Sequence, residues 1–67
     1  MEEATVEYDV GFVTIDMPFN QEVIDRLKEE IPPDERHWDD GRKVWAVNDR
    51  YWITARAIIE EFFVITE

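Results

Sequence analysis

The amino-acid sequence predicts a small α+β domain in which a mainly antiparallel sheet, in ββαββα order, carries two helices on one face. Two stretches alternate apolar and polar residues on either side of turn residues, as hairpins do. Two further stretches repeat apolar residues at helical spacing, so the order is hairpin, helix, hairpin and helix. Hairpins separated by helices favour an antiparallel sheet that is covered on one side. We therefore expect residues 1–67 to form a single domain.

The first hairpin is expected between Thr5 and Met17. The alternation changes phase at Asp9-Val10-Gly11, which is a short turn signal, and a single bulged strand is the alternative. In either case one face of the second half turns toward the core. The core-facing residues of this half are Val13, Ile15 and Met17.

The first helix is expected to begin after Asn20, whose side chain suits the N-cap position. It ends before Pro32-Pro33, because proline cannot donate a helical hydrogen bond. Its apolar stripe consists of Val23, Ile24, Leu27 and Ile31.

The second helix is expected to run from about Arg50 to about Phe63, with Asn48 or Asp49 as its cap. Its buried stripe consists of Tyr51, Ala55, Ile58, Ile59 and Phe62. The last residues, Val64-Ile65-Thr66, are expected to form a short strand or an extended tail.

The second hairpin lies between the two helices. Asp40-Gly41 predicts a two-residue turn, since glycine accepts the positive φ that such turns require. With this turn, Trp38 lies opposite Lys43 and Arg36 lies opposite Trp45. The residues that then share the core face are Trp38, Trp45 and Val47. Trp52, near the start of the second helix, is expected to be the partly exposed tryptophan.

The other face of the sheet is a second candidate interface, and a contact between two copies of the chain is one use for it. Its predicted members are Phe12, Thr14, His37, Val44 and Ala46.

The size and composition bound what the domain can be. A domain of 67 residues buries only about 60% of its unfolded surface, so large side chains must build the core. Cysteine is absent, so no disulfide can stabilise the fold.

No apolar run approaches the roughly 20 residues that span a bilayer, and the acidic start Met1-Glu2-Glu3 is unlike a secretory signal. We expect a cytoplasmic protein without a membrane partner.

The residue types present exclude most enzyme classes. There is no serine or cysteine nucleophile, and His37 is the only histidine, so neither a catalytic triad nor a His-rich metal site can be assembled. Gly11 and Gly41 belong to turns rather than to a phosphate-binding loop. We expect a protein that is not an enzyme and that has no cofactor or metal. A solvated rim, rather than an acid and base pair, is expected from the neighbouring carboxylates Asp34, Glu35, Asp39 and Asp40.

The formal net charge is −10, and the charges are unevenly distributed. No lysine or arginine occurs before Arg26 or after Arg56. Long-range repulsion of phosphates weighs against a protein that binds nucleic acid mainly by electrostatics. Scarce lysine and abundant carboxylates would also suit a salt-loving host, an explanation that needs no partner.

The basic residues gather around the second hairpin. Turns with several arginines are common binding sites, although the neighbouring carboxylates explain these charges equally well by surface pairing. The candidates for contact with nucleic acid or a partner are Arg36, His37, Arg42, Lys43 and Arg50.

Glu60 and Glu61 stand near the C-terminal end of the second helix, where the helix dipole disfavours a carboxylate by about 0.3–1 kcal/mol. Their position suggests a role other than helix stability. The alternative hypothesis is therefore an acidic adaptor or inhibitor, viral in one version, that mimics DNA or docks on a basic surface. Its candidate residues are Glu2, Glu3, Glu60 and Glu61.

One composite pattern runs through most of the chain. It consists of Val13-x-Ile15-x-Met17, Val23-Ile24-x-x-Leu27-Lys28, Ile31-Pro32, Trp38-Asp39, Lys43-Val44-Trp45-x-Val47 and Tyr51 at the start of a helix. This pattern, over residues 12–63, resembles the HARP (HepA-related protein) domain, a small module found beside the motor of annealing helicases and in phage and microbial proteins.

The resemblance implies a module that helps to engage single-stranded or forked DNA. It places Arg36, Arg42 and Lys43 at the contact and makes Trp38 and Trp45 part of the framework. We therefore expect a small non-enzymatic accessory module of nucleic-acid metabolism, which contacts DNA weakly and works with a larger nucleic-acid-processing protein.

Overall fold

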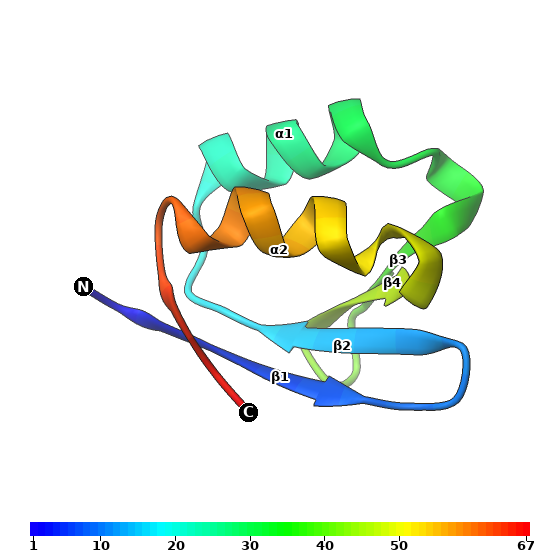
Figure 1. The fold of residues 1–67 in the computed structure, drawn as a ribbon, viewed down its shortest axis with the longest axis horizontal. Helices are drawn as coiled ribbons and strands as arrows, with labels where there is room; N and C mark the ends of the chain where they lie inside the picture. Colours follow the sequence, from blue (N-terminus) through cyan, green and yellow to red (C-terminus); the bar gives the residue numbers. More distant parts are fainter.

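The computed structural model describes residues 1–67 as a five-stranded sheet with two α-helices on one face (Figure 1). The strands are β1 (Glu3–Tyr8), β2 (Phe12–Asp16), β3 (Arg36–Asp39), β4 (Val44–Asn48) and β5 (Val64–Thr66). Their order across the sheet is β3-β4-β2-β1-β5, and all neighbours are antiparallel except β1 and β5. The helices are α1 (Gln21–Glu30) and α2 (Trp52–Glu60). The α+β prediction is confirmed.

The first hairpin forms as predicted, with a turn between β1 and β2 rather than a single bulged strand. Gly11 adopts a φ of 85°, a conformation that favours glycine because it has no Cβ. Val13 and Ile15 are fully buried and Met17 packs against the core at its edge. The change of phase at the turn therefore marks a genuine reversal of the chain.

α1 begins and ends where the local chemistry predicts. The Asn20 side chain accepts a hydrogen bond from the backbone N–H of Val23 at 3.2 Å, which satisfies one free donor of the first turn. The helix closes with the Ile31 N–H donating to the Leu27 carbonyl, immediately before Pro32-Pro33. The side chains that it buries are Val23, Leu27 and Ile31.

The second hairpin has a different register from the predicted one. Its turn contains four residues, Asp40–Lys43, so that Trp38 lies opposite Trp45 and Asp39 lies opposite Val44. The Asp39 carboxylate accepts a hydrogen bond from the Arg42 N–H at 3.0 Å, and the Asp39 carbonyl accepts one from the Lys43 N–H at 2.7 Å. These two bonds stabilise the longer turn, in which Lys43 takes a φ of 59°.

The side chains of β3 and β4 still lie on the predicted faces of the sheet, because the register differs from the predicted one by two residues. A shift of one residue moves every side chain to the opposite face of a strand, whereas a shift of two restores the original face. Trp45 and Val47 accordingly lie in the core, and the Trp38 ring packs at a tilt of 55° against Trp45, with ring centroids 5.4 Å apart.

The prediction for Trp52 is wrong. Trp52 is only 9% exposed, whereas Trp38 is 41% exposed. The Tyr8 ring packs edge-on against Trp52, at a centroid distance of 6.0 Å, and covers it from the first hairpin. Trp38 has no equivalent cover because β3 is the edge strand of the sheet.

α2 is shorter than predicted. The Asn48 side chain caps a short 3₁₀ turn, η2 (Asp49–Tyr51), by accepting a hydrogen bond from the Arg50 N–H, and the α-helix itself begins at Trp52. The helix ends at Glu60 because the chain then turns to bring β5 alongside β1. Of the two alternatives for the last residues, the short strand is confirmed.

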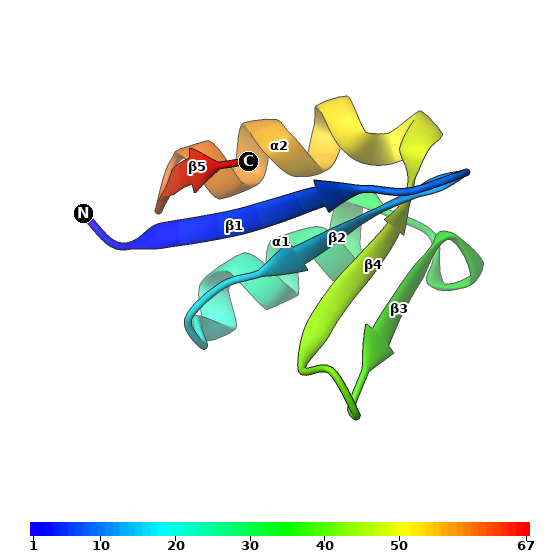
Figure 2. The same ribbon diagram turned by 90° about the horizontal axis from the view of Figure 1, so that it is seen from below.

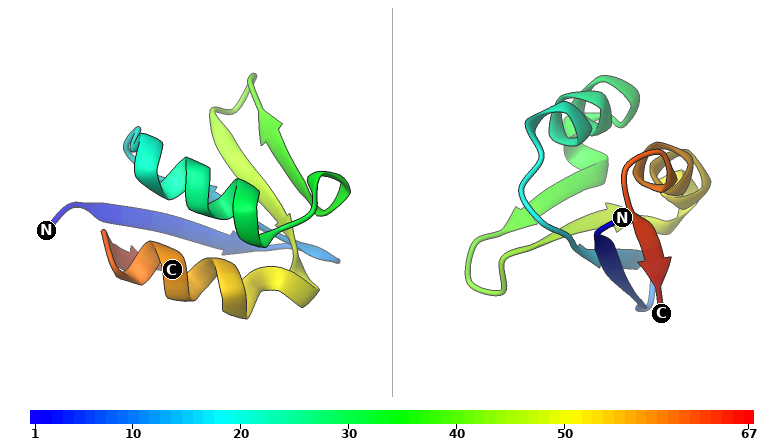
Figure 3. Two further views of the ribbon diagram at one scale, coloured as in Figure 1. Left: turned by 90° about the horizontal axis from the view of Figure 1, so that it is seen from above. Right: turned by 90° about the vertical axis from the view of Figure 1, so that its left-hand side faces the viewer.

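The two helices lie side by side in an antiparallel arrangement over one face of the sheet (Figure 3). Between the layers is a core of buried residues from both helices and from β1, β2 and β4. The opposite face of the sheet carries no helix (Figure 2). Another short 3₁₀ turn, η1 (Pro33–Glu35), leads from α1 to β3 at the rim of that face.

No helix combines the length and apolar character needed to cross a membrane.

Two isoleucines of α2 provide a matched test of this packing. Ile59 is fully buried and Ile53 is 83% exposed. We expect Ile59→Ala to lower the free energy of unfolding by about 2–5 kcal/mol, because it leaves a cavity in the core. Ile53→Ala should change it by no more than about 0.5 kcal/mol. Urea unfolding followed by circular dichroism measures both, and equal losses would contradict the layer arrangement.

Candidate functional site

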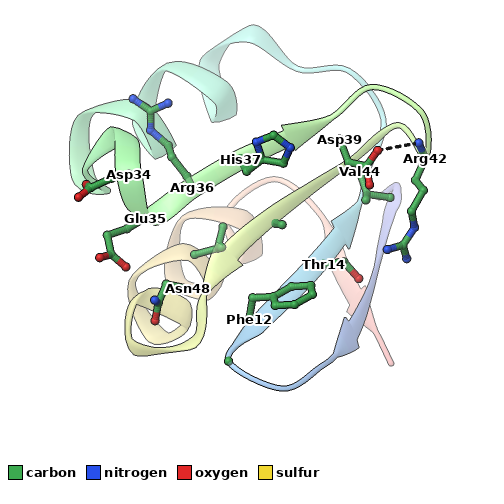
Figure 4. A pocket seen from close by; sticks show the side chains of 13 residues that line it. Phe12, Thr14, Asp34, Glu35, Arg36, His37, Asp39, Arg42, Val44 and Asn48 are labelled. Carbon is green, nitrogen blue, oxygen red and sulfur yellow. Dashed lines mark hydrogen bonds between the residues drawn. The ribbon is translucent and has the colours of Figure 1, made fainter.

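The uncovered face of the sheet contains a hollow of about 450 Å³ (Figure 4). Its walls come from β2, β3 and β4, from the turn between β3 and β4, and from η1. All five residues predicted for this face line it, namely Phe12, Thr14, His37, Val44 and Ala46. The sequence-based interpretation of the outer face is therefore confirmed in its geometry.

Arg42 lies at the border between this hollow and a second one. The smaller hollow, of about 220 Å³, is lined by Thr5, Glu7 and Asp16 on its far side. Arg42, Thr14 and Val44 line both hollows. One Arg42 guanidinium nitrogen lies 3.9 Å from a Glu7 carboxylate oxygen, so the cation bridges from the hairpin turn toward β1.

The predicted basic cluster is divided between the two faces and the two ends of the hairpin. Arg36 points to the helix side and donates from Nε to the Ile31 carbonyl at 3.0 Å. His37 lies on the uncovered face, within the hollow. Lys43 lies in the turn, where its ammonium group is 2.9 Å from an Asp40 carboxylate oxygen. Arg36, His37 and Arg42 nevertheless all line the hollow, whereas Lys43 and Arg50 lie outside it.

Arg50 lies at the other end of the hairpin from the turn. Its Nε donates to the Asn48 side-chain oxygen at 3.3 Å and lies 3.9 Å from Glu35 Oε2. Glu35 Oε2 is shielded from solvent and accepts no hydrogen bond. The predicted solvated rim is therefore wrong for Glu35, whose side chain is only 20% exposed. Glu35 is the last residue of the 3₁₀ turn η1, directly before β3, and it lines the hollow.

The four acidic candidates lie in different parts of the molecule. Glu3 lies on the uncovered face of β1, while Glu2 is exposed at the edge and its carbonyl accepts a hydrogen bond from Val64 N–H. Glu60 lies 3.4 Å from Arg56 on α2, on the helix side. Glu61 also belongs to the helix side, so these residues do not form one acidic patch.

Glu61 has a structural partner that the sequence pattern did not reveal. Both of its carboxylate oxygens accept hydrogen bonds from the Arg26 guanidinium, at 2.8 and 3.0 Å, which ties the end of α2 to α1. These hydrogen bonds lower the pKa of Glu61 below its ordinary value of 4.5 and raise the pKa of Arg26. The pair accounts for a carboxylate at an unfavourable helix end.

The donor sets available on the molecule are limited. No three side chains among histidine, aspartate and glutamate are grouped as a metal site would require. The hollow does combine an aromatic ring, an imidazole, a guanidinium and carboxylates above an apolar floor. Such a lining suits binding of a partner through several weak polar contacts.

Comparisons with protein-family models, with curated proteins and with solved structures found no match to this chain.

The Arg26–Glu61 pair predicts a specific dependence of stability on pH. Because the folded-state pKa of Glu61 is lowered, the pair stabilises the fold above the ordinary pKa of 4.5 and loses this contribution as the pH falls through the folded-state value. We expect Glu61→Gln to be less stable than the wild type at neutral pH. The two proteins should converge in acid, as measured by urea unfolding at a series of pH values.

Arg26→Gln supplies the control, because it deletes the same pair from the other side. It should reproduce the effect of Glu61→Gln, and the double variant should be no less stable than either single variant. A difference between wild type and Glu61→Gln that stays constant through the acid range would contradict the assignment.

Proposed function

We propose that this chain is a non-enzymatic binding module whose uncovered sheet face docks on a basic surface of a larger protein in the cytoplasm. The observation that supports this most directly is the combination of a whole sheet face without a covering helix and a hollow with charged side chains around an apolar floor. Hollows with an apolar floor and a few polar groups are the usual form of binding sites.

The negative charge of the uncovered face favours one class of partner. The strands of the uncovered face carry four carboxylates, the turn adds Arg42 and an ion pair between Lys43 and Asp40, and the whole chain has a formal charge of −10. Those carboxylates are Glu3, Glu7, Asp16 and Asp39. A second copy of the chain would bring like charges together, whereas a basic protein surface is attracted and oriented.

A protein that handles nucleic acid fits this description, because its surface must be basic to hold phosphates. The HARP-like pattern of residues 12–63 favours the same setting, since it resembles a module that works beside a DNA motor. In this proposal the chain is an acidic adaptor or inhibitor that occupies a basic surface where DNA would otherwise lie.

Charge reversal on one face tests the proposal. We expect the double variant Glu7→Lys, Asp16→Lys to lose a basic partner that the wild type recovers from an extract of the native host. The control is Asp25→Lys, Glu29→Lys, which changes the net charge equally but on α1, and which should retain the partner. Quantitative affinity purification at two salt concentrations measures the difference, and equal recovery by both variants would contradict the proposal.

Weak contact with single-stranded or forked DNA is the second candidate function. The observation in its favour is that Arg42 and Lys43 lie together at the exposed tip of the second hairpin, the end that the HARP resemblance assigns to DNA. Phe12 and His37 lie on the same face as Arg42 and offer rings on which bases could stack.

Fluorescence anisotropy with a labelled forked oligonucleotide at low salt tests this second function. We expect Arg42→Glu and Lys43→Glu each to weaken binding and to reduce its salt dependence by about one phosphate contact. Arg56→Glu is the control because it lies on α2, on the covered side. No binding by the wild type at low salt would exclude this function for the isolated chain.

A further inference from the structure

We infer that a second copy of this chain pairs with the outer edge of β3, so that two five-stranded sheets join across a two-fold axis. β3 pairs with β4 along one side only, and no strand or helix runs along its other side (Figure 2). The backbone groups of an open edge are a template for another strand. This contact leaves the uncovered face of the sheet free, so the inference does not depend on the proposed function.

Trp38 is the apolar part of this edge. It is 41% exposed, although its ring packs against that of Trp45 on the neighbouring strand β4. A strand added to β3 covers Trp38 from the side that lies away from Trp45. Aromatic residues directly opposite each other on neighbouring strands stabilise the pairing. A second Trp38 at this place would continue the row of tryptophan rings across the two-fold axis.

The charges of the edge are complementary when the axis passes through Trp38. Residues directly opposite each other in an antiparallel pair share a face, and their side chains interact. In this register His37 lies opposite Asp39 of the second copy, and its ring can donate a hydrogen bond to that carboxylate. Arg36 lies opposite Asp40 of the second copy. The two-fold axis makes each of these favourable pairs occur twice.

The neighbouring symmetric registers are unfavourable. With the axis at His37, Glu35 lies opposite Asp39 of the second copy. With the axis at Asp39, that carboxylate lies opposite its own equivalent. Like charges directly opposite each other destabilise a strand pair. The side chains therefore favour the single register that is centred on Trp38.

The high net charge of the chain lies mostly outside this contact. Residues 34–43 carry four carboxylates and three cationic side chains, so they contribute little to the formal charge of −10. Exposed charges further apart than about 8 Å are largely screened at physiological salt. Because β3 has only four residues, the interface is small, and we expect a weak dimer that forms with increasing concentration.

Sedimentation velocity of the full chain over a range of concentrations tests the inference. We expect a reversible equilibrium of monomer and dimer, with concentration-dependent ¹H–¹⁵N NMR shifts at the amides of β3. Asp40→Arg should weaken the dimer by about tenfold or more, because it places a cation opposite Arg36 at both symmetric sites. The control is Glu67→Arg, which makes the same charge change next to β5 at the opposite edge and should retain the dimer.

A mixture of two variants tests the register. Arg36→Glu alone places two carboxylates opposite each other and should also weaken the dimer. Mixed with Asp40→Arg, it restores opposite charges at both sites, so the mixture should dimerise about as readily as the wild type.

The side chain of Asp40 is 83% exposed, so Asp40→Arg should fold normally, and circular dichroism checks both variants. If Arg36→Glu is unfolded, the comparison of Asp40→Arg with Glu67→Arg decides alone. A monomer at all concentrations, shifts confined to the uncovered face, equal dimerisation of Asp40→Arg and Glu67→Arg, or no gain on mixing the folded variants would each overturn the inference.

Discussion

The alternation of side chains across the sheet is the constraint on which the rest of this structure depends. Each strand sends successive residues to opposite faces, and a chain of 67 residues has only two helices with which to cover them. Both helices lie on the same face, where the apolar members of β1, β2 and β4 form the core. The other face has no covering helix (Figure 2), and the hollow lies there, with Phe12, Val44 and Ala46 among its lining residues.

The sequence was sufficient for those parts of the fold that depend on periodicity. The faces of the strands and the Asn20 cap are local properties, and each was predicted correctly. The central residues of the second helix, Ala55, Ile58 and Ile59, are buried as predicted, whereas Tyr51 and Phe62 are only partly buried. The register of the second hairpin was not predicted correctly, because Asp39 accepts hydrogen bonds from the N–H groups of Arg42 and Lys43, and these stabilise a longer turn than Asp40-Gly41 indicates. The error left the faces unchanged only because two residues were added to the turn.

The parts of the site that escaped prediction depend on contacts between distant segments. Glu61 meets Arg26, which lies 35 residues away, so its place at a helix end looked unexplained in the sequence. Trp52 is covered by Tyr8 from the first hairpin, which no pattern within α2 could indicate. The partial burial of Glu35, at the end of the 3₁₀ turn η1, also depends on how this turn meets the sheet. The sequence also did not show which basic candidates share the hollow, namely Arg36, His37 and Arg42, because this depends on the three-dimensional arrangement.

The pairing of β5 with β1 has a consequence for how the chain folds. It joins the last strand to the first, so its contacts, such as that between Ala4 and Ile65, are the least local in the sheet and carry a high cost in loop-closure entropy. Until β5 arrives, the apolar alternation of β1 forms an open edge to which another chain can add. The three residues of β5 cover Glu3–Thr5 of this edge, and what they leave at the border of the sheet is a very short edge strand, which offers little backbone for another chain to pair with.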